Sequence, residues 1–193
     1  MSGSLDPADV GSDPARQIEL AHDTAWAVLR AARAIGQAPV DLVERMGGLD
    51  ELTALWRHAE PATLPSSLLT LHVLRAWCRT QGAEAARIYR AGLTRAEVSH
   101  AVAGVVEPPG PEDLADLADA VLTSTYRDDL AIALERASAF CAVIGAGRES
   151  EAHDRAGDDP EEATRQLRLA AGNARAARDL ARAAAAWRAG TLQ

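Results

Sequence analysis

The segment 64–81, LPSSLLTLHVLRAWCRTQ, is the most apolar run of its length in the chain and constrains the fold more than any other feature. Its apolar residues recur every three or four positions, which is the spacing of one face of an α-helix. These residues are Leu64, Leu68, Leu71, Leu74 and Cys78, with Val73 and Trp77 widening the face. Polar residues such as Thr70 and Arg75 interrupt the run, which makes it too polar to span a bilayer. We therefore predict a helix at the centre of a core.

The amino-acid composition predicts that the rest of the chain is helical as well. Of 193 residues, 43 are alanine and 20 are arginine, none is lysine, and the aromatics amount to 4%. Alanine has the highest intrinsic helix propensity, and β-branched residues are few. The absence of lysine together with so much alanine is typical of the coding bias of a high-GC bacterial genome. The expected fold class is all-α.

Capping residues and helix-breaking residues divide the chain into eight or nine predicted helices, packed as a multi-helix bundle. Gly92 is expected to end one helix, and Thr94 and Glu97 have the spacing of a capping box for the next. Gly145 and Gly147 are expected to end another. Three further apolar stripes are predicted to bury the central helix: Leu114–Val121, Leu130–Ile144 and Leu169–Trp187.

The predicted organisation is a single helical domain with a distinct C-terminal helix. Residues 1–12 are small, polar and acidic and are expected to form a flexible tail, followed by a bundle core over 13–146. Residues 147–159 are charged and poor in apolar side chains, so we predict an acidic linker there. Residues 160–190 are predicted to form a long basic amphipathic helix that packs on the same domain, starting at the Asp159 cap.

The charge of the chain is unevenly distributed, because the arginines of this last helix make it basic while the rest of the chain is acidic. Residues 165–193 contain six Arg and one Asp, for a net charge of +5, which leaves −13 on the remainder because the total is −8. Arg168, Arg175 and Arg182 lie seven residues apart, with Arg165 and Arg178 beside them. These five arginines are the predicted partner-binding residues.

Three interpretations of this basic face were weighed. The favoured one is that it packs on an acidic part of the same chain, around Glu107, Glu112, Asp113, Asp116 and Asp119. The second is docking on an acidic protein or on a second copy of the chain. The third, contact with nucleic acid or an anionic membrane, is the least favoured because the whole chain is acidic and the apolar face of the helix is mostly alanine.

The alternative to a binding role is a metal-binding enzyme. Two Glu-x-x-His pairs, Glu19–His22 and Glu97–His100, have the spacing that ferritin-like di-iron sites use. Such a site also needs two carboxylates from other helices, and Glu44 and Glu135 stand in the wrong order and spacing to supply them. We therefore interpret all four residues as exposed helix positions and predict no metal or other cofactor.

Two other side-chain sets were considered. Cys78 and Cys141 each fall on a regular apolar stripe, which favours core packing over nucleophilic catalysis. A ligand pocket bordered by His72, Arg75 and Trp77 is a third hypothesis.

The leading functional hypothesis is a non-catalytic protein that acts through helix-face contacts, as an adaptor, a regulator or a homo-oligomer. No glycine-rich phosphate loop, Cys-x-x-Cys or His-Glu-x-x-His motif occurs in the sequence. The N-terminal residues lack the features of a signal peptide, so a cytoplasmic location is expected.

Overall fold

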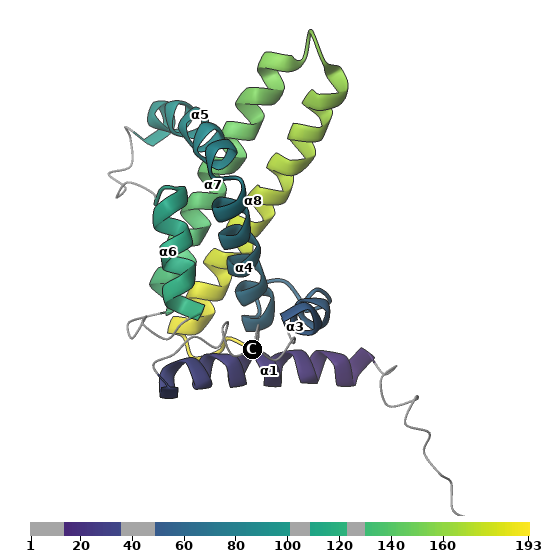
Figure 1. The fold of residues 1–193 in the computed structure, drawn as a ribbon, viewed down its shortest axis with the longest axis vertical. Helices are drawn as coiled ribbons and strands as arrows, with labels where there is room; N and C mark the ends of the chain where they lie inside the picture. The colour runs from purple at the N-terminus through teal and green to yellow at the C-terminus, as the bar shows by residue number, and fades with distance from the viewer. Residues whose placement is uncertain (1–13, 36–48, 101–108, 123–129) are drawn as a thin grey trace, which may run out of the picture.

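The computed structural model of the protein describes residues 14–35, 49–100, 109–122 and 130–193, and within them the side chains of all but 31–35, 49–50, 95–100 and 119–122. The described residues form α-helices and no strand, which confirms the all-α class (Figure 1). The seven helices are α1 (Pro14–Ile35), α3 (Leu49–Trp56), α4 (Leu64–Thr80), α5 (Gly82–His100), α6 (Pro111–Leu122), α7 (Leu130–Arg155) and α8 (Pro160–Arg188). The described residues thus contain seven helices where eight or nine were predicted for the chain, in part because α5 is one continuous helix. A helix expected near 39–46 lies outside the described residues.

Helix α4 packs against α1, α3, α5, α6 and α8 as the central helix that the apolar run predicts. Its backbone begins where expected, because the amide of Thr63 donates to Ser66 Oγ at 3.1 Å. All five residues of the predicted stripe are buried. Val73 is the exception to the predicted face, since it lies on the opposite side of the helix and is 53% exposed.

Helices α7 and α8 form a long antiparallel hairpin whose tip extends beyond the other helices (Figure 1). The start of α8 agrees with the prediction, because Asp159 caps the helix by accepting from the amide of Glu162 at 3.0 Å. The structure differs from the prediction at 147–159, where we expected a linker. Helix α7 continues to Arg155, and only a short turn joins it to α8.

Small residues bring the two helices of this hairpin close together. The interface side of α8 buries Ala163, Ala170, Ala183 and Ala184. Ser138 Oγ of α7 donates to the carbonyl of Ala177 across the interface at 2.7 Å. A Cβ on Gly145 would come within 3.5 Å of the carbonyl oxygen of Ala170, in ordinary contact. Four of the six buried residues of α8 are alanines, the others being Gln166 and Leu180, while Leu169, which we expected to face inward, is 37% exposed.

Helix α5 crosses α7 at two glycines that place the backbones in direct contact. A Cβ on Gly92 would lie 2.0 Å from the carbonyl oxygen of Val143, and one on Gly147 would lie 2.0 Å from that of Ile88. The prediction that these glycines end helices was wrong, because both helices run through them. The predicted capping box that begins at Thr94 was also wrong. Thr94 lies inside the continuous helix α5, where its Oγ1 donates to the carbonyl of Arg90.

Helices α1 and α3 close the lower end of the bundle (Figure 1). Ala21, Ala25 and Leu29 of α1 are buried, and Trp56 Nε1 of α3 donates to Thr24 Oγ1 at 3.0 Å. The ring of Trp26 stacks on Trp187 of α8, with 5.9 Å between the centroids. This stacking fixes the far end of α8 to the base of the protein.

Among the described helices, α7 has the length and composition that would allow it to cross a membrane. Its most apolar window is 61% buried inside the protein, and the core helix of a globular fold meets the same criterion.

The glycine crossing yields a stability prediction. Gly92→Ala and Gly147→Ala should each lower the free energy of unfolding by about 3 kcal/mol, because the new methyl group forces the two backbones apart. Denaturant unfolding followed by circular dichroism measures this. Gly172→Ala is the matched control, since a Cβ there meets nothing within 4 Å and removal of a helical glycine should stabilise the protein by about 0.5–1 kcal/mol. Equal effects at all three positions would contradict the crossing.

Candidate functional site

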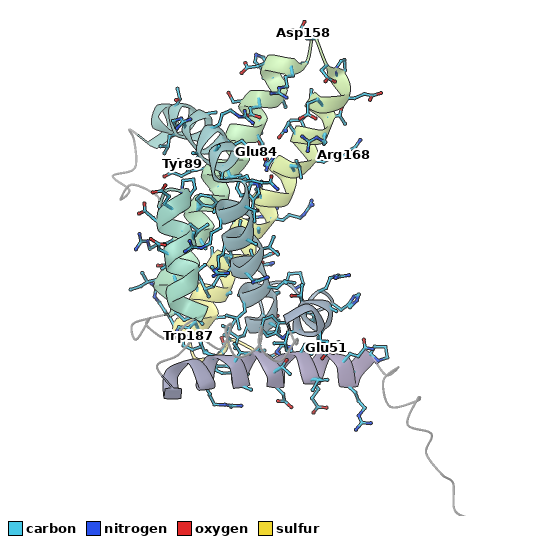
Figure 2. The ribbon with its side chains drawn as sticks, in the orientation of Figure 1. Glu51, Glu84, Tyr89, Asp158, Arg168 and Trp187 are labelled. Carbon is cyan, nitrogen blue, oxygen red and sulfur yellow. The ribbon has the colours of Figure 1, made fainter. Side chains whose placement is uncertain are left out.

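Four arginines of α8 line one outward side of the helix, and we call this set the arginine face. Its members are Arg168, Arg175, Arg178 and Arg182, all of which are exposed. At 100° per residue they fall within an arc of about 80° and extend over about 21 Å of helix. Figure 2 shows Arg168 pointing away from the body of the protein.

Most of the charge on this face is not neutralised within the described part of the chain. Arg168, Arg175 and Arg178 form no ion pair with another described residue. Arg182 pairs with Asp179 on its own helix. Arg165, which we had predicted as a partner-binding residue with these four, instead pairs with Glu162 through two hydrogen bonds of 2.6 and 2.7 Å.

The favoured interpretation, in which the basic face packs on an acidic part of the chain, is not what the described residues show. Helix α8 does pack on the same bundle, but through its alanine side. Asp116, one of the acidic residues invoked, pairs with Arg79 of α4 at 3.2 Å. Glu107 and the side chain of Asp119 lie outside the described residues. The arginine face is therefore directed to solvent.

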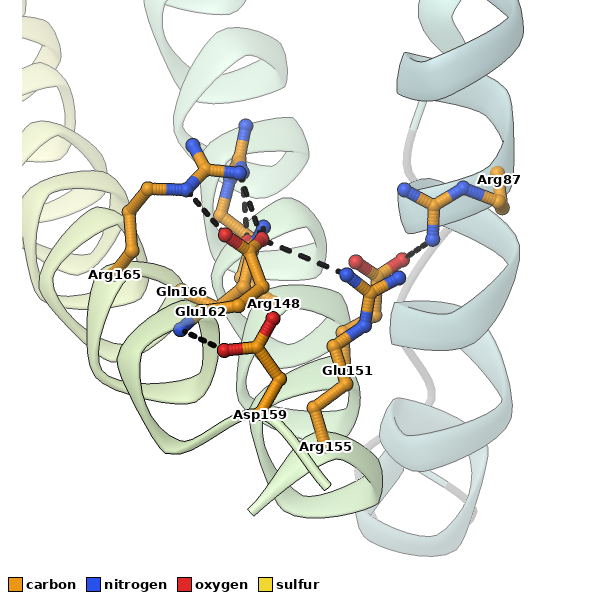
Figure 3. A network of polar contacts seen from close by, with 8 residues as sticks. All are labelled: Arg87, Arg148, Glu151, Arg155, Asp159, Glu162, Arg165 and Gln166. Atoms are coloured by element: carbon orange, nitrogen blue, oxygen red, sulfur yellow. Dashed lines mark hydrogen bonds and ion pairs between the residues drawn. The ribbon is translucent and has the colours of Figure 1, made fainter. Parts of the chain in front are cut away.

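A polar cluster at the upper part of the hairpin holds the first turns of α8 in place (Figure 3). We call it the hairpin network, and it consists of Arg87 of α5, Arg148, Glu151 and Arg155 of α7, and Glu162, Arg165 and Gln166 of α8. Gln166 is its central link, since its Oε1 accepts from Arg148 at 2.9 Å while its Nε2 donates to Glu162 at 2.7 Å. Arg87 pairs with Glu151, and Arg155 lies 3.6 Å from Glu162. Three helices are thus joined by hydrogen bonds and ion pairs.

Arg148 is the buried centre of this network. Its side chain is 8% exposed, and its guanidinium lies over the ring of Trp77, 5.3 Å from the centroid. Burial lowers the pKa of Arg148, while the nearby carboxylate of Glu84 acts in the opposite direction. Sequence reasoning missed this network because it assigned 147–159 to a linker. The i, i+3 spacing of Arg148 and Glu151 was the available signal for a helix.

The predicted metal-ligand candidates do not form a site within the described residues. Glu19 is exposed on α1 and His22 is half-buried one turn further along. The side chains of Glu97 and His100 lie outside the described part of α5, and Glu44 lies outside the described residues altogether. Glu135 is engaged by Arg188. No group of three or more His, Cys, Asp or Glu side chains among those described could hold a metal ion.

The ligand pocket predicted beside His72, Arg75 and Trp77 coincides with none of the observed hollows. Trp77 is in edge contact with Phe140, 6.4 Å between centroids, and it is covered by Arg148 on its face. His72 and Arg75 lie beside it on α4 and are half-buried. Two hollows in the described residues lie elsewhere, one between α1 and α3 and one at the first turn of α8.

Both cysteines are buried thiols in the core. Desolvation raises the pKa of Cys78 to about 11, and desolvation together with the neighbouring Cys78 raises that of Cys141 to about 12. A thiol with so high a pKa carries almost no thiolate near neutral pH and is therefore a poor nucleophile.

Comparisons with known proteins add no assignment. The chain matches no protein-family model, no curated protein sequence and no solved structure.

The hairpin network predicts a specific acid sensitivity. Hydrogen bonds from Arg165 and Gln166 lower the pKa of Glu162 from 4.5 to about 2. A carboxyl whose pKa is lower in the folded state stabilises the protein above its unfolded pKa and loses that contribution as the pH falls. Glu162→Gln should therefore be less stable than the parent at pH 6, and the difference should shrink between pH 4.5 and 2.

Thermal unfolding across this pH range measures the effect. Glu161→Gln is the matched control, because Glu161 lies in the same helical turn, is exposed and forms no ion pair with another described residue. If the difference between the parent and Glu162→Gln does not change with pH, Glu162 does not titrate as the structure implies.

The cysteines predict a simple reactivity pattern. In the native protein at pH 8, neither thiol should react with a disulfide reagent such as Ellman's reagent, because both are buried and protonated. Both should react completely after addition of denaturant. Stoichiometric labelling of the native protein would show that at least one thiol is accessible and ionised.

Proposed function

We propose that this protein is a non-catalytic helical binding protein that docks an acidic α-helix of a partner protein along the arginine face. The observation that carries this proposal is the exposure of three arginines, Arg168, Arg175 and Arg178, that no described carboxylate neutralises. The described residues contain no metal-binding group. The two thiols are buried and protonated.

The spacing of the face favours a helix as the partner element. Successive arginines are separated by seven, three and four residues, which is the heptad spacing with which two helices stay in register. Carboxylates at the same spacing on a partner helix would meet the guanidinium groups one by one. Arginine is suited to this because its planar fork can bind a carboxylate through two hydrogen bonds.

Leu167 supplies an apolar contact at one end of the face. It lies on the same side of α8 as the arginines and is 53% exposed. The hairpin network fixes the helical turn that carries it, so little conformational freedom is lost on binding. An interface of this kind combines an apolar anchor with charged contacts that set the register.

Other partners fit the face less well. Two copies of α8 side by side would bring arginine against arginine, so self-association through this face is disfavoured. The net charge of −8 opposes an extended approach to nucleic acid. An acidic helix gains from the local positive charge and needs only the exposed side of one helix.

A designed peptide tests the proposal. The probe is a stable helix with glutamates at heptad spacing, and its control has the same composition with the glutamates distributed around the helix. The parent should bind the first peptide at least about tenfold more tightly, because only that peptide can meet several arginines at once. Fluorescence anisotropy at low and moderate salt measures both affinities.

Variants make the test specific to the face. Arg168→Glu, Arg175→Glu and Arg178→Glu combined should abolish the preference for the matched peptide. The control is Arg30→Glu, Arg90→Glu and Arg136→Glu combined, which changes the net charge equally at exposed sites away from the face. Equal binding of the two peptides, unchanged binding by the first variant, or tighter binding of duplex nucleic acid than of the matched peptide would overturn the proposal.

A further inference from the structure

The N-terminal half of α1 is a second surface without cover in the described structure. This part of the helix projects past α3 and away from the bundle (Figure 1). Residues 14–20 are all exposed, in contrast to the alternation of buried and exposed positions that follows from Ala21 onward. They include two of the large apolar side chains that remain exposed, Ile18 at 38% and Leu20 at 53%.

Two hollows lie along the contact between this half of α1 and α3. The larger has a volume of about 650 Å³ and is lined by Arg16, Glu19, Leu20 and Asp23 of α1, by Leu55 of α3 and by His58 in the turn after α3. The smaller, of about 200 Å³, is lined on its α1 side by Pro14, Gln17, Ile18 and Ala21 and includes Leu55 of α3. Ile18 and Leu20 point to opposite sides of α1, so the smaller hollow borders the Ile18 side of the helix and the larger hollow borders the Leu20 side.

A projecting helical end of this kind gains stability when another surface covers it. A helix without tertiary packing is marginal in water, and most helical stability in proteins comes from burial of one apolar side. In α1 that burial begins at Ala21, so the turns before it leave much of their apolar area exposed.

The charges on this half of α1 are complementary to a second copy of themselves. Along α1, Arg16 lies one turn before Leu20 and Asp23 lies one turn after it, and Glu19 directly precedes Leu20. None of these three charged residues forms an ion pair with another described residue. When two copies of the segment lie antiparallel, Arg16 of each copy is placed beside the carboxylates of the other. In a two-fold interface every such contact occurs twice.

We propose that the surface formed by the first half of α1 and the adjoining face of α3 is a two-fold interface between two copies of this chain. The helices α1 lie antiparallel in it, Leu20 packs against the partner's α1 and α3, and Arg16 pairs with Asp23 of the partner subunit. A different partner protein is less favoured, because the segment has nearly balanced charge and offers little electrostatic attraction to a strongly charged surface. The interface is separate from the arginine face.

Charge reversal in pairs tests this arrangement. Sedimentation equilibrium of the parent should show a monomer–dimer equilibrium. Arg16→Glu and Asp23→Arg should each weaken dimerisation at least about tenfold, because each places like charges together twice in the interface. The double variant Arg16→Glu/Asp23→Arg should restore the dimer, since it exchanges the two charges and keeps the net charge of the parent.

Controls separate the interface from general charge effects and from misfolding. Arg30→Glu, on the same helix beyond the proposed contact, should leave the dimer unchanged. Leu20→Asp should give a monomer with an unchanged helical circular dichroism spectrum, because Leu20 is already exposed in a single chain. A parent that stays monomeric at its highest soluble concentration, or a double variant that fails to restore association, would overturn the proposal.

Discussion

The direct backbone contact between α5 and α7 is the constraint on which the rest of the arrangement depends. Gly92 and Gly147 each leave room for the carbonyl group of the facing helix, so that the two helices approach more closely than any side chain would allow. This contact sets the position of Ile88 and Tyr89 in the core, where Tyr89 stacks on Phe140 of α7. It also brings Arg87 within reach of Glu151, which is how α5 joins the hairpin network.

Helix α8 is held near both of its ends. Near the tip, Arg148 and Gln166 connect the helices through a buried hydrogen bond. At the base, Trp26 stacks on Trp187 and holds the last turns. A buried arginine is costly unless its hydrogen-bonding groups find partners, and the bond to Gln166 offsets only part of this cost, because Nε of Arg148 has no hydrogen-bond partner among the described residues. The arginine face is consequently presented by a helix held along its whole length.

The sequence predicts correctly the elements whose signals are local. It fails where a glycine can either end a helix or lie at a helix crossing, and where a charged segment can be either a linker or a helix. The stripe from Leu64 to Cys78 and the Asp159 cap were predicted correctly, because periodicity and capping depend only on neighbouring residues. The sequence predicts helix ends at Gly92 and Gly147, because the space that each leaves for the facing backbone depends on residues distant in sequence. The charged residues from Arg148 to Arg155 resembled a linker, since their partners on α5 and α8 are distant in sequence. The arginine spacing on α8 was visible, but its direction toward solvent depended on which side the alanines pack.

The alanine side of α8 has a thermodynamic consequence. Alanine has no side-chain torsion to fix, so burying Ala170, Ala183 and Ala184 against α7 loses no rotamer entropy, whereas burying leucine or methionine would. Each alanine removes little apolar area from water, and the hairpin compensates by length rather than by large side chains. The two helices of the hairpin are therefore stabilised by close packing that costs little side-chain entropy.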